Sequence, residues 1–159
     1  MKDKLLKGVL HLNTTKNNGF RFLDFIAIKE EEIKGHAPIA GSFAVISCEE
    51  KILMVYNVWR EQWELPAGRR EGDETEKECA IRELYEETGQ YITELEFKGL
   101  LKLENSSDGS IKYNPVFAGS TEKLQPFLKN DETSEMKLWD RSEVLGVIDE
   151  MDLKILDYI

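Results

Sequence analysis

The segment from Gly68 to Gly89 limits what this chain can fold into more than any other feature. It reads GRREGDETEKECAIRELYEETG, a glycine loop that leads into a predicted helix. At about 100° per residue, four acids share one stripe of that helix: Glu76, Glu83, Glu86 and Glu87. Like charges three or four residues apart destabilise a helix by roughly 0.2–0.5 kcal/mol per pair. A bound divalent cation would offset this cost.

The opposite side of the predicted helix is mostly apolar. It is formed by Ile81, Leu84, Tyr85 and Thr88. Because such a stripe docks on a core, the acids are expected to face an edge or a cleft. Asp73 and Glu76 have the spacing of a capping box, and Gly89 suits the left-handed position after a helix. The alternative interpretation is a solvated acidic face, which is common on protein surfaces.

The segment resembles the Nudix box, the signature of the Nudix (MutT-like) hydrolases. That pattern is Gly, five residues, Glu, seven residues, Arg-Glu-aliphatic, one residue, Glu-Glu, one residue, Gly and an aliphatic. Eight of its nine fixed positions are filled, by Gly68, Glu74, Arg82, Glu83, Leu84, Glu86, Glu87 and Gly89. The ninth holds Gln90 instead of an aliphatic residue. Agreement at this many positions with the correct spacing is a specific signal.

The resemblance implies a site for a divalent cation, Mg²⁺ with Mn²⁺ as the alternative, that grips a pyrophosphate. Glu83 and Glu87 are the expected metal ligands, Glu86 is a further or water-mediated ligand, and the Gly68 carbonyl is another. Oxygen ligands of this kind suit Mg²⁺, which neutralises phosphate charge and activates a water molecule.

The resemblance also assigns roles around the metal. Arg82 is expected to hold Glu74 by a bidentate, charge-assisted pair that fixes the loop against the helix. Family members take the general base from the box or from a later loop, so Glu83 is one candidate. Glu135 and Glu132, in an acidic loop that precedes a predicted strand, are the others. The alternative for that loop is a hydrophilic surface segment with incidental acids.

The junction before the box favours one substrate class. Residues 64–68 read ELPAG, as in the ADP-ribose and nucleoside-diphosphate-sugar branch, whereas triphosphate-cleaving relatives more often carry Phe-Pro-Gly-Gly. The expected reaction is hydrolysis of a nucleoside diphosphate linked to another moiety, such as ADP-ribose, to a nucleoside monophosphate. The proline that usually follows the box in the ADP-ribose subgroup is absent at its expected place. A pyrophosphohydrolase of (oxidised) nucleoside triphosphates, of the MutT type, is therefore the alternative.

Two other classes of function remain as alternatives. A non-catalytic Nudix-fold module that senses a nucleotide is one, although such modules typically lose box glutamates or carry a DNA-binding domain. The other is an acidic interaction protein whose carboxylates bind Ca²⁺ or a basic partner. Turnover of a nucleotide with Mg²⁺ would separate the enzyme from both.

Cations and aromatics near the box are candidate substrate contacts. Arg60 lies between Trp59 and Trp63 in the sequence, and Arg69 and Arg70 follow Gly68. The arginines are expected to contact phosphates. Trp59 or Trp63 could contact a base, with Trp63 as the expected one, since stacking contributes about 1–3 kcal/mol per base. The alternative is that the tryptophans pack in the core and the loop charges are solvated.

Composition limits the partners. The net charge of −10 argues against non-specific binding to nucleic acid or to an anionic membrane.

Residues 1–10 have no apolar run long enough for a signal peptide or a membrane span, so a cytoplasmic enzyme is expected. Cys48 and Cys79 lack metal-ligand spacing and are expected to be reduced thiols. Because family members are often dimers, a homodimer is one expected assembly.

The length of 159 residues fits a single domain over residues 1–159. A solvated turn is expected at residues 30–32. Alternating apolar patterns predict strands at residues 20–28, 39–47, 51–58, 95–103 and 113–120, with an edge strand at 137–139. The second and third should form a hairpin. Further helices are expected at residues 142–146 and 149–159. This order predicts an α/β fold of the α+β type, a mixed β-sheet sandwiched between helices, as in the Nudix fold.

Overall fold

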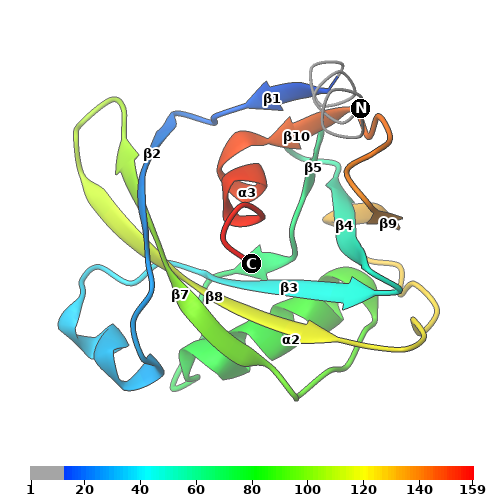
Figure 1. The fold of residues 1–159 in the computed structure, drawn as a ribbon, viewed down its shortest axis with the longest axis horizontal. Coiled ribbons are helices and arrows are strands. Elements are labelled where there is room, and N and C mark those ends of the chain that lie inside the picture. The colour runs from blue at the N-terminus through cyan, green and yellow to red at the C-terminus, as the bar shows by residue number, and fades with distance from the viewer. Residues whose placement is uncertain (1–12) are drawn as a thin grey trace.

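The computed structural model describes residues 13–159, which form a mixed sheet of ten strands with helices on both faces (Figure 1). The strands are β1 (Thr14–Lys16), β2 (Phe20–Ile26), β3 (Ser42–Cys48), β4 (Lys51–Asn57), β5 (Gln62–Glu64), β6 (Ala67–Gly68), β7 (Glu96–Asn105), β8 (Ile111–Ser120), β9 (Thr133–Trp139) and β10 (Val147–Asp149). The helices are the 3₁₀ helix η1 (Glu30–Gly35), α2 (Glu76–Thr88) and α3 (Glu150–Ile155). The expected turn at residues 30–32 is thus the start of η1.

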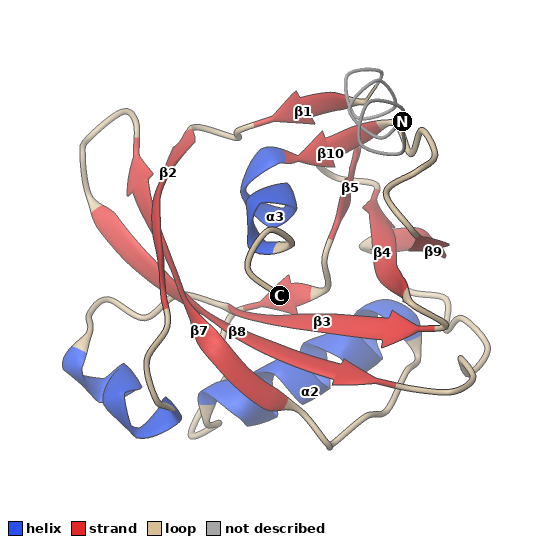
Figure 2. Cartoon of the chain, in the orientation of Figure 1, coloured by secondary structure: helices blue, strands red, loops and turns tan. Residues whose placement is uncertain are grey.

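The strands follow the order β1-β10-β5-β4-β3-β8-β7-β2, with β6 paired to β3 and β9 paired to β4. β3 runs parallel to β8, and β10 runs parallel to both β1 and β5, whereas the other pairs are antiparallel (Figure 2). β3 and β4 form the predicted hairpin, in which Ser47 lies opposite Ile52. The predicted mixed sheet is confirmed.

Alternate residues of β3 pack in two separate hydrophobic cores. On one face, Val45 packs in a cluster that includes Met151 and Ile155 from α3. On the other face, Ile46 packs with Leu84 from α2. Because successive side chains of a strand point to opposite faces, one apolar run supports a helix on each side. Figure 1 shows α2 and α3 on opposite sides of β3.

The helix α2 begins two residues later than its sequence predicts. Thr75 is the N-cap, its Oγ1 accepts from the Glu78 N–H at 3.1 Å, and its own N–H donates to Glu78 Oε1 at 2.9 Å. The expected capping role of Asp73 is therefore wrong. Thr-x-x-Glu satisfies two backbone donors reciprocally at this position. The predicted end is confirmed, because Gly89 has a φ of 83°.

The buried side of α2 differs in part from the predicted apolar stripe. Leu84 and Thr88 are fully buried as expected, but Tyr85 is exposed and Ile81 is half-buried. Cys79, Ala80 and Glu87 complete the buried side instead, although Glu87 was expected on the acidic side. Tyr85 lies about 100° further round the helix than Leu84, which places it beyond the contact with the sheet.

The C-terminal segment contains less helix than predicted. Residues 142–146 are not helical, because the backbone N–H groups of Leu145 and Gly146 donate to Asn13 Oδ1, at 2.7 and 2.9 Å. The last helix spans only Glu150–Ile155, and Asp149 caps it by accepting from two backbone N–H groups. Side-chain acceptors from distant or flanking residues thus decide the backbone here.

The described residues also test the expectations about cysteines and membrane-spanning helices. Both cysteines are free, as expected. None of the helices in this part of the chain has the length and apolar composition needed to cross a membrane. The expectation drawn from residues 1–10 lies outside the described residues.

Candidate functional site

The segment from Gly68 to the start of α2 at Glu76, which we call the Gly68 loop, lies directly against α2. A Cβ atom added to Gly68 would be 2.1 Å from Cδ of Glu83, so only glycine allows this approach without displacing the carboxylate. β6 holds the loop in place by pairing with β3, with Gly68 opposite Ser42. The Cys79 thiol donates to the Gly68 carbonyl oxygen at 3.1 Å. The box glycine and the first box glutamate of the expected metal site are therefore neighbours in space.

Arg82 connects the loop to the helix. Its Nε and Nη2 donate to the two carboxylate oxygens of Glu74 at 2.6 and 3.0 Å, and Nη2 also donates to the Arg69 carbonyl at 2.8 Å. The predicted bidentate pair is present. Nη1 donates to Glu83 at 2.8 Å and to Glu86 at 3.0 Å. The hydrogen bonds from Arg82 are the main reason that the pKa of Glu74 is lowered.

Glu87 is a buried carboxyl group, only 3% exposed, at the junction of α2 and the loop. Its Oε2 accepts from the Ala67 N–H at 3.0 Å. Burial, followed by a hydrogen bond with Glu132 and the charges of Glu132 and Glu83, raises the pKa of Glu87 to about 10. Burial also raises the pKa of Glu83 to about 7, against the opposing effect of Arg82. The site thus brings together buried carboxyl groups, and too little positive charge lies nearby to stabilise their ionised forms.

These groups match a divalent cation by donor type. The carboxylates of Glu83, Glu86 and Glu87 and the carbonyl of Gly68 are hard oxygen donors. A cation would also stabilise the ionised forms that burial disfavours. Among residues 13–159, no three acidic, histidine or cysteine side chains already surround one point as metal ligands. An ion must compete with Arg82 for Glu83 and Glu86.

The loop before β9 brings one of its two candidate bases to α2. Oε2 of Glu132 accepts from Asn57 Nδ2 at 3.2 Å, and Glu132 also forms the hydrogen bond with Glu87. Glu135 instead lies within β9, in register with Tyr56, and is exposed. The acid cluster therefore consists of Glu83, Glu86, Glu87 and Glu132, and of the two candidate bases in the loop only Glu132 belongs to it.

Gln90, the departure from the box pattern, anchors this loop. It is buried, its Nε2 donates to the Gln125 carbonyl at 2.7 Å, and its Oε1 accepts from the Gln125 N–H at 2.7 Å. Thr133 Oγ1 donates to the Glu87 carbonyl at 2.7 Å, a second tie between loop and helix. An aliphatic residue at position 90 could make neither of the two bonds to Gln125. The unusual polar residue was a signal of this contact.

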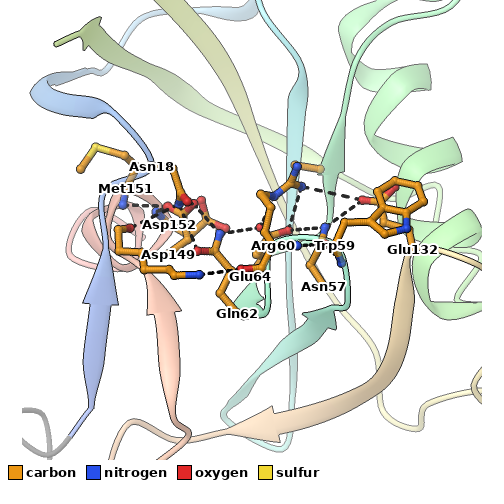
Figure 3. A network of polar contacts seen from close by, with 12 residues as sticks. Asn18, Asn57, Trp59, Arg60, Gln62, Glu64, Glu132, Asp149, Met151 and Asp152 are labelled. Atoms are coloured by element: carbon orange, nitrogen blue, oxygen red, sulfur yellow. Dashed lines mark hydrogen bonds and ion pairs between the residues drawn. The ribbon is translucent and has the colours of Figure 1, made fainter. Parts of the chain in front are cut away.

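A polar network supports the other side of the site (Figure 3). Arg60 donates to Glu64 through Nε at 2.6 Å and through Nη2 at 3.1 Å, and its Nη2 is 3.9 Å from Glu132. Gln62 Nε2 joins Glu64 to Asp149, at 2.6 and 3.0 Å. Arg60 therefore pairs with Glu64 but stays half exposed, and its expected contact with a phosphate stays a prediction.

A cavity of about 610 Å³ opens beside the Gly68 loop. We call it the Gly68 cavity, and its polar lining includes Arg60, Glu64, Arg69, Arg70, Lys112, Asn114, Asp149 and Asp152. The three arginines expected to bind substrate all line it. Arg70 also lies 3.5 Å from Glu76. Burial raises the pKa of Asp152 well above its ordinary value, and this carboxyl accepts from the Leu65 N–H at 2.8 Å.

Of the two candidate tryptophans, Trp59 and not Trp63 lies near the acids. Trp63 is 7% exposed, belongs to the core and packs edge to face on Tyr56, with ring centroids 5.5 Å apart. The expectation that it contacts a base is corrected, because its side chain is buried in the core. Trp59 is 66% exposed and lines a second pocket, of about 370 Å³. We call this the acidic pocket, because all four members of the acid cluster also line it.

The sequence pattern of the NUDIX domain matches residues 35–157. The chain is 34% identical over 62 residues to mRNA-decapping enzyme subunit 2 of Arabidopsis thaliana, covering 39% of this chain and 17% of that protein. It is 36% identical over 56 residues to YvcI, an uncharacterised Nudix hydrolase of Bacillus subtilis, covering 35% of each chain. The chain thus spans about a third or less of these relatives.

Solved structures share the fold. The NUDIX domain of Shewanella oneidensis NrtR, complexed with ADP ribose, superposes with a TM-score of 0.62 at 18% identity, over 82% of this chain and 96% of that chain. A MutT NUDIX hydrolase from Burkholderia pseudomallei gives a TM-score of 0.66 at 17% identity, over 78% and 99%. The sequence match covers well over half of the chain, which therefore belongs to the NUDIX domain family.

Proposed function

We propose that this protein is a metal-dependent pyrophosphohydrolase. Its substrate would be a nucleoside diphosphate linked to another moiety, hydrolysed to a nucleoside monophosphate. The observation that carries this proposal is the junction of the Gly68 loop with α2. There the loop backbone lies against Glu83, Arg82 ties both elements together, and buried Glu87 faces Glu132. A surface acidic patch would need none of these close contacts.

The acid cluster supplies the groups that this chemistry requires. Mg²⁺ or Mn²⁺ would be held by Glu83, Glu86, Glu87 and the Gly68 carbonyl. When bound, the ion would neutralise phosphate charge and lower the pKa of a water molecule. Arg82 would position Glu83 and, through Glu74, the loop. Positioning residues of this kind are typically worth about 10–100-fold in metal affinity or activity.

Glu132 is our candidate for the residue that accepts the proton of the attacking water, and Glu83 is the alternative within the box. Asn57 donates to one oxygen of Glu132, which fixes the carboxylate beside Glu87. A base must lie within hydrogen-bond reach of the proton that it removes, and the exposed position of Glu135 on β9 lies outside the acid cluster. The role of Glu135 stays a prediction that substitution can test.

The Gly68 cavity supports a substrate with a sizeable organic group. Cations from Arg69, Arg70 and Lys112 can meet phosphates, and the carboxyl groups of Asp149 and Asp152 can meet donors of a sugar or base. Among the proteins of similar fold are a NUDIX domain complexed with ADP ribose and a MutT NUDIX hydrolase. Hydrolysis of an (oxidised) nucleoside triphosphate is therefore the alternative activity.

A substrate panel tests the proposal. ADP-ribose, diadenosine polyphosphates and nucleoside triphosphates, including oxidised forms, would be incubated with Mg²⁺ or Mn²⁺, and the products separated by chromatography. We expect nucleoside monophosphate from a substrate of the linked-diphosphate class, and loss of its formation in Glu83→Gln. Water labelled with ¹⁸O would identify the attacked phosphorus. Binding without turnover across the whole panel would favour a nucleotide-sensing module. Sedimentation would test the expected homodimer.

A further inference from the structure

Exposed apolar side chains converge on the acidic pocket. Trp59 is 66% exposed, and Tyr85 and Leu128 are each 45% exposed. They come from the turn after β4, from α2 and from the loop before β9, and all three line the pocket that also contains the acid cluster. Large apolar groups beside carboxylates are typical of a site for a ligand with a planar face and a charged group.

The turn that carries Trp59 is held rigidly. The backbone N–H groups of Trp59 and Arg60 donate to Oδ1 of buried Asn57 at 2.9 and 3.0 Å. The Val58 N–H donates to the Glu132 carbonyl at 2.9 Å. Figure 3 shows Trp59 beside Glu132, with Asn57 adjacent to both. The backbone is thus fixed at the acid cluster while the indole ring remains available to a ligand.

We propose that the acidic pocket binds an aromatic base of the substrate, stacked on Trp59. Tyr85 and Leu128 would contact the edges of the base, and Lys129, which lines the same pocket, would meet a phosphate of the same moiety. Stacking of a base on an aromatic side chain tolerates every base because each has a π-face. This inference rests on the proposed function and specifies its substrate.

The two hollow regions are neighbours, because residues that line one contact residues that line the other. Gly68 lines the Gly68 cavity and touches Glu83, which lines the acidic pocket. Arg60 likewise lines the cavity and lies 3.9 Å from Glu132 of the pocket. An anhydride placed at this shared wall would extend in both directions. The substrate would therefore carry an organic group on each side of the hydrolysed bond, with a base on the side of Trp59.

A matched substrate pair tests this inference. ADP-ribose differs from the diphosphate of two ribose 5-phosphates only by its adenine, so the ratio of their kcat/KM values isolates the base. We expect ADP-ribose to be preferred by about 5-fold to 150-fold, the range that corresponds to stacking on one aromatic side chain. Trp59→Ala should reduce the ratio to near one, and Trp59→Phe should retain most of it. Val58→Ala, in the same turn but outside the pocket, is the matched control.

The ratio of dissociation constants, measured by calorimetry, separates this inference from the proposed function. If both compounds bind with a ratio that depends on Trp59 but neither is hydrolysed, the base site stands and the proposed activity fails. If the wild type shows no preference, or if Trp59→Ala keeps the preference, the base site is overturned. Circular dichroism of each variant would confirm that its fold is unchanged.

Discussion

Replacing Glu87 by glutamine should make the metal-free protein more stable. Glu87 is 3% exposed, and its pKa is raised from 4.5 to about 10 by burial, by its hydrogen bond with Glu132 and by nearby charges. Glutamine cannot ionise, and its carbonyl oxygen can still accept from the Ala67 N–H that now donates to Glu87. The substitution therefore removes an ionisable group that burial disfavours and keeps its hydrogen bond.

The raised pKa sets both the magnitude and the pH dependence. Below pH 4.5 the carboxyl group is protonated in both states and contributes nothing. Between pH 4.5 and 10 the unfolded chain releases the proton while the folded protein retains it, so the free energy of unfolding falls as the pH rises. At about 1.4 kcal/mol per pH unit, the loss at pH 7 is about 3 kcal/mol. Glu87→Gln should recover most of it.

Urea unfolding with EDTA would measure this difference. The gap between Glu87→Gln and wild type should widen by about 2–3 kcal/mol between pH 5.5 and pH 7.5. Mg²⁺ should then stabilise wild type by mass action and Glu87→Gln much less. The control is Glu86→Gln, because the half-exposed side chain should change stability by under about 0.5 kcal/mol. A variant that is no more stable than wild type at pH 7.5, or a gap independent of pH, would refute the reasoning.

The other predictions concern activity. Gly68→Ala should lower kcat at least about tenfold, because the new methyl group displaces the Glu83 carboxylate, and overpacking should cost about 1–3 kcal/mol of stability by urea unfolding. Arg82→Lys should reduce metal affinity or activity by about 10–100-fold in Mg²⁺ titrations, since lysine lacks the fork that holds both the loop and the acids. Glu132→Gln should lower kcat by about 100-fold or more with little change in KM, whereas Glu135→Gln should stay near wild type in the same steady-state assay. The reverse result would return the role of base to Glu135.

Local patterns predicted most of the sheet. Alternating apolar residues identified β2, β3, β4, β7 and β8 to within three residues at each end, because each strand has one or both faces in a core. The short strands β1, β5, β6 and β10 have only two or three residues each, too few for a period to be visible. The predicted helix over residues 142–146 was wrong because Asn13, distant in the sequence, takes its backbone donors.

The candidate site, like the sheet, was predicted only in part from the sequence. The shared side of Glu83 and Glu87 could be read directly, because one turn of helix brings residues four apart to the same side. Gly68 and Arg82 were identified from the box pattern. The bidentate partner of Arg82 was predicted as well, since the box pattern contains both residues. Trp63 and Trp59 could not be distinguished, because burial depends on which elements cover a side chain.

The sequence by itself determined that a loop and an acidic helix form one local unit, because their geometry depends on contacts within about twenty residues. Only the tertiary structure decided what surrounds that unit. Asn57 and Glu132 are separated by 75 positions, and Gln90 and Gln125 by 35, yet each pair is joined by hydrogen bonds at the site. Such partners are chosen by the packing of the whole sheet, which brings distant segments together and leaves no periodic trace in the chain.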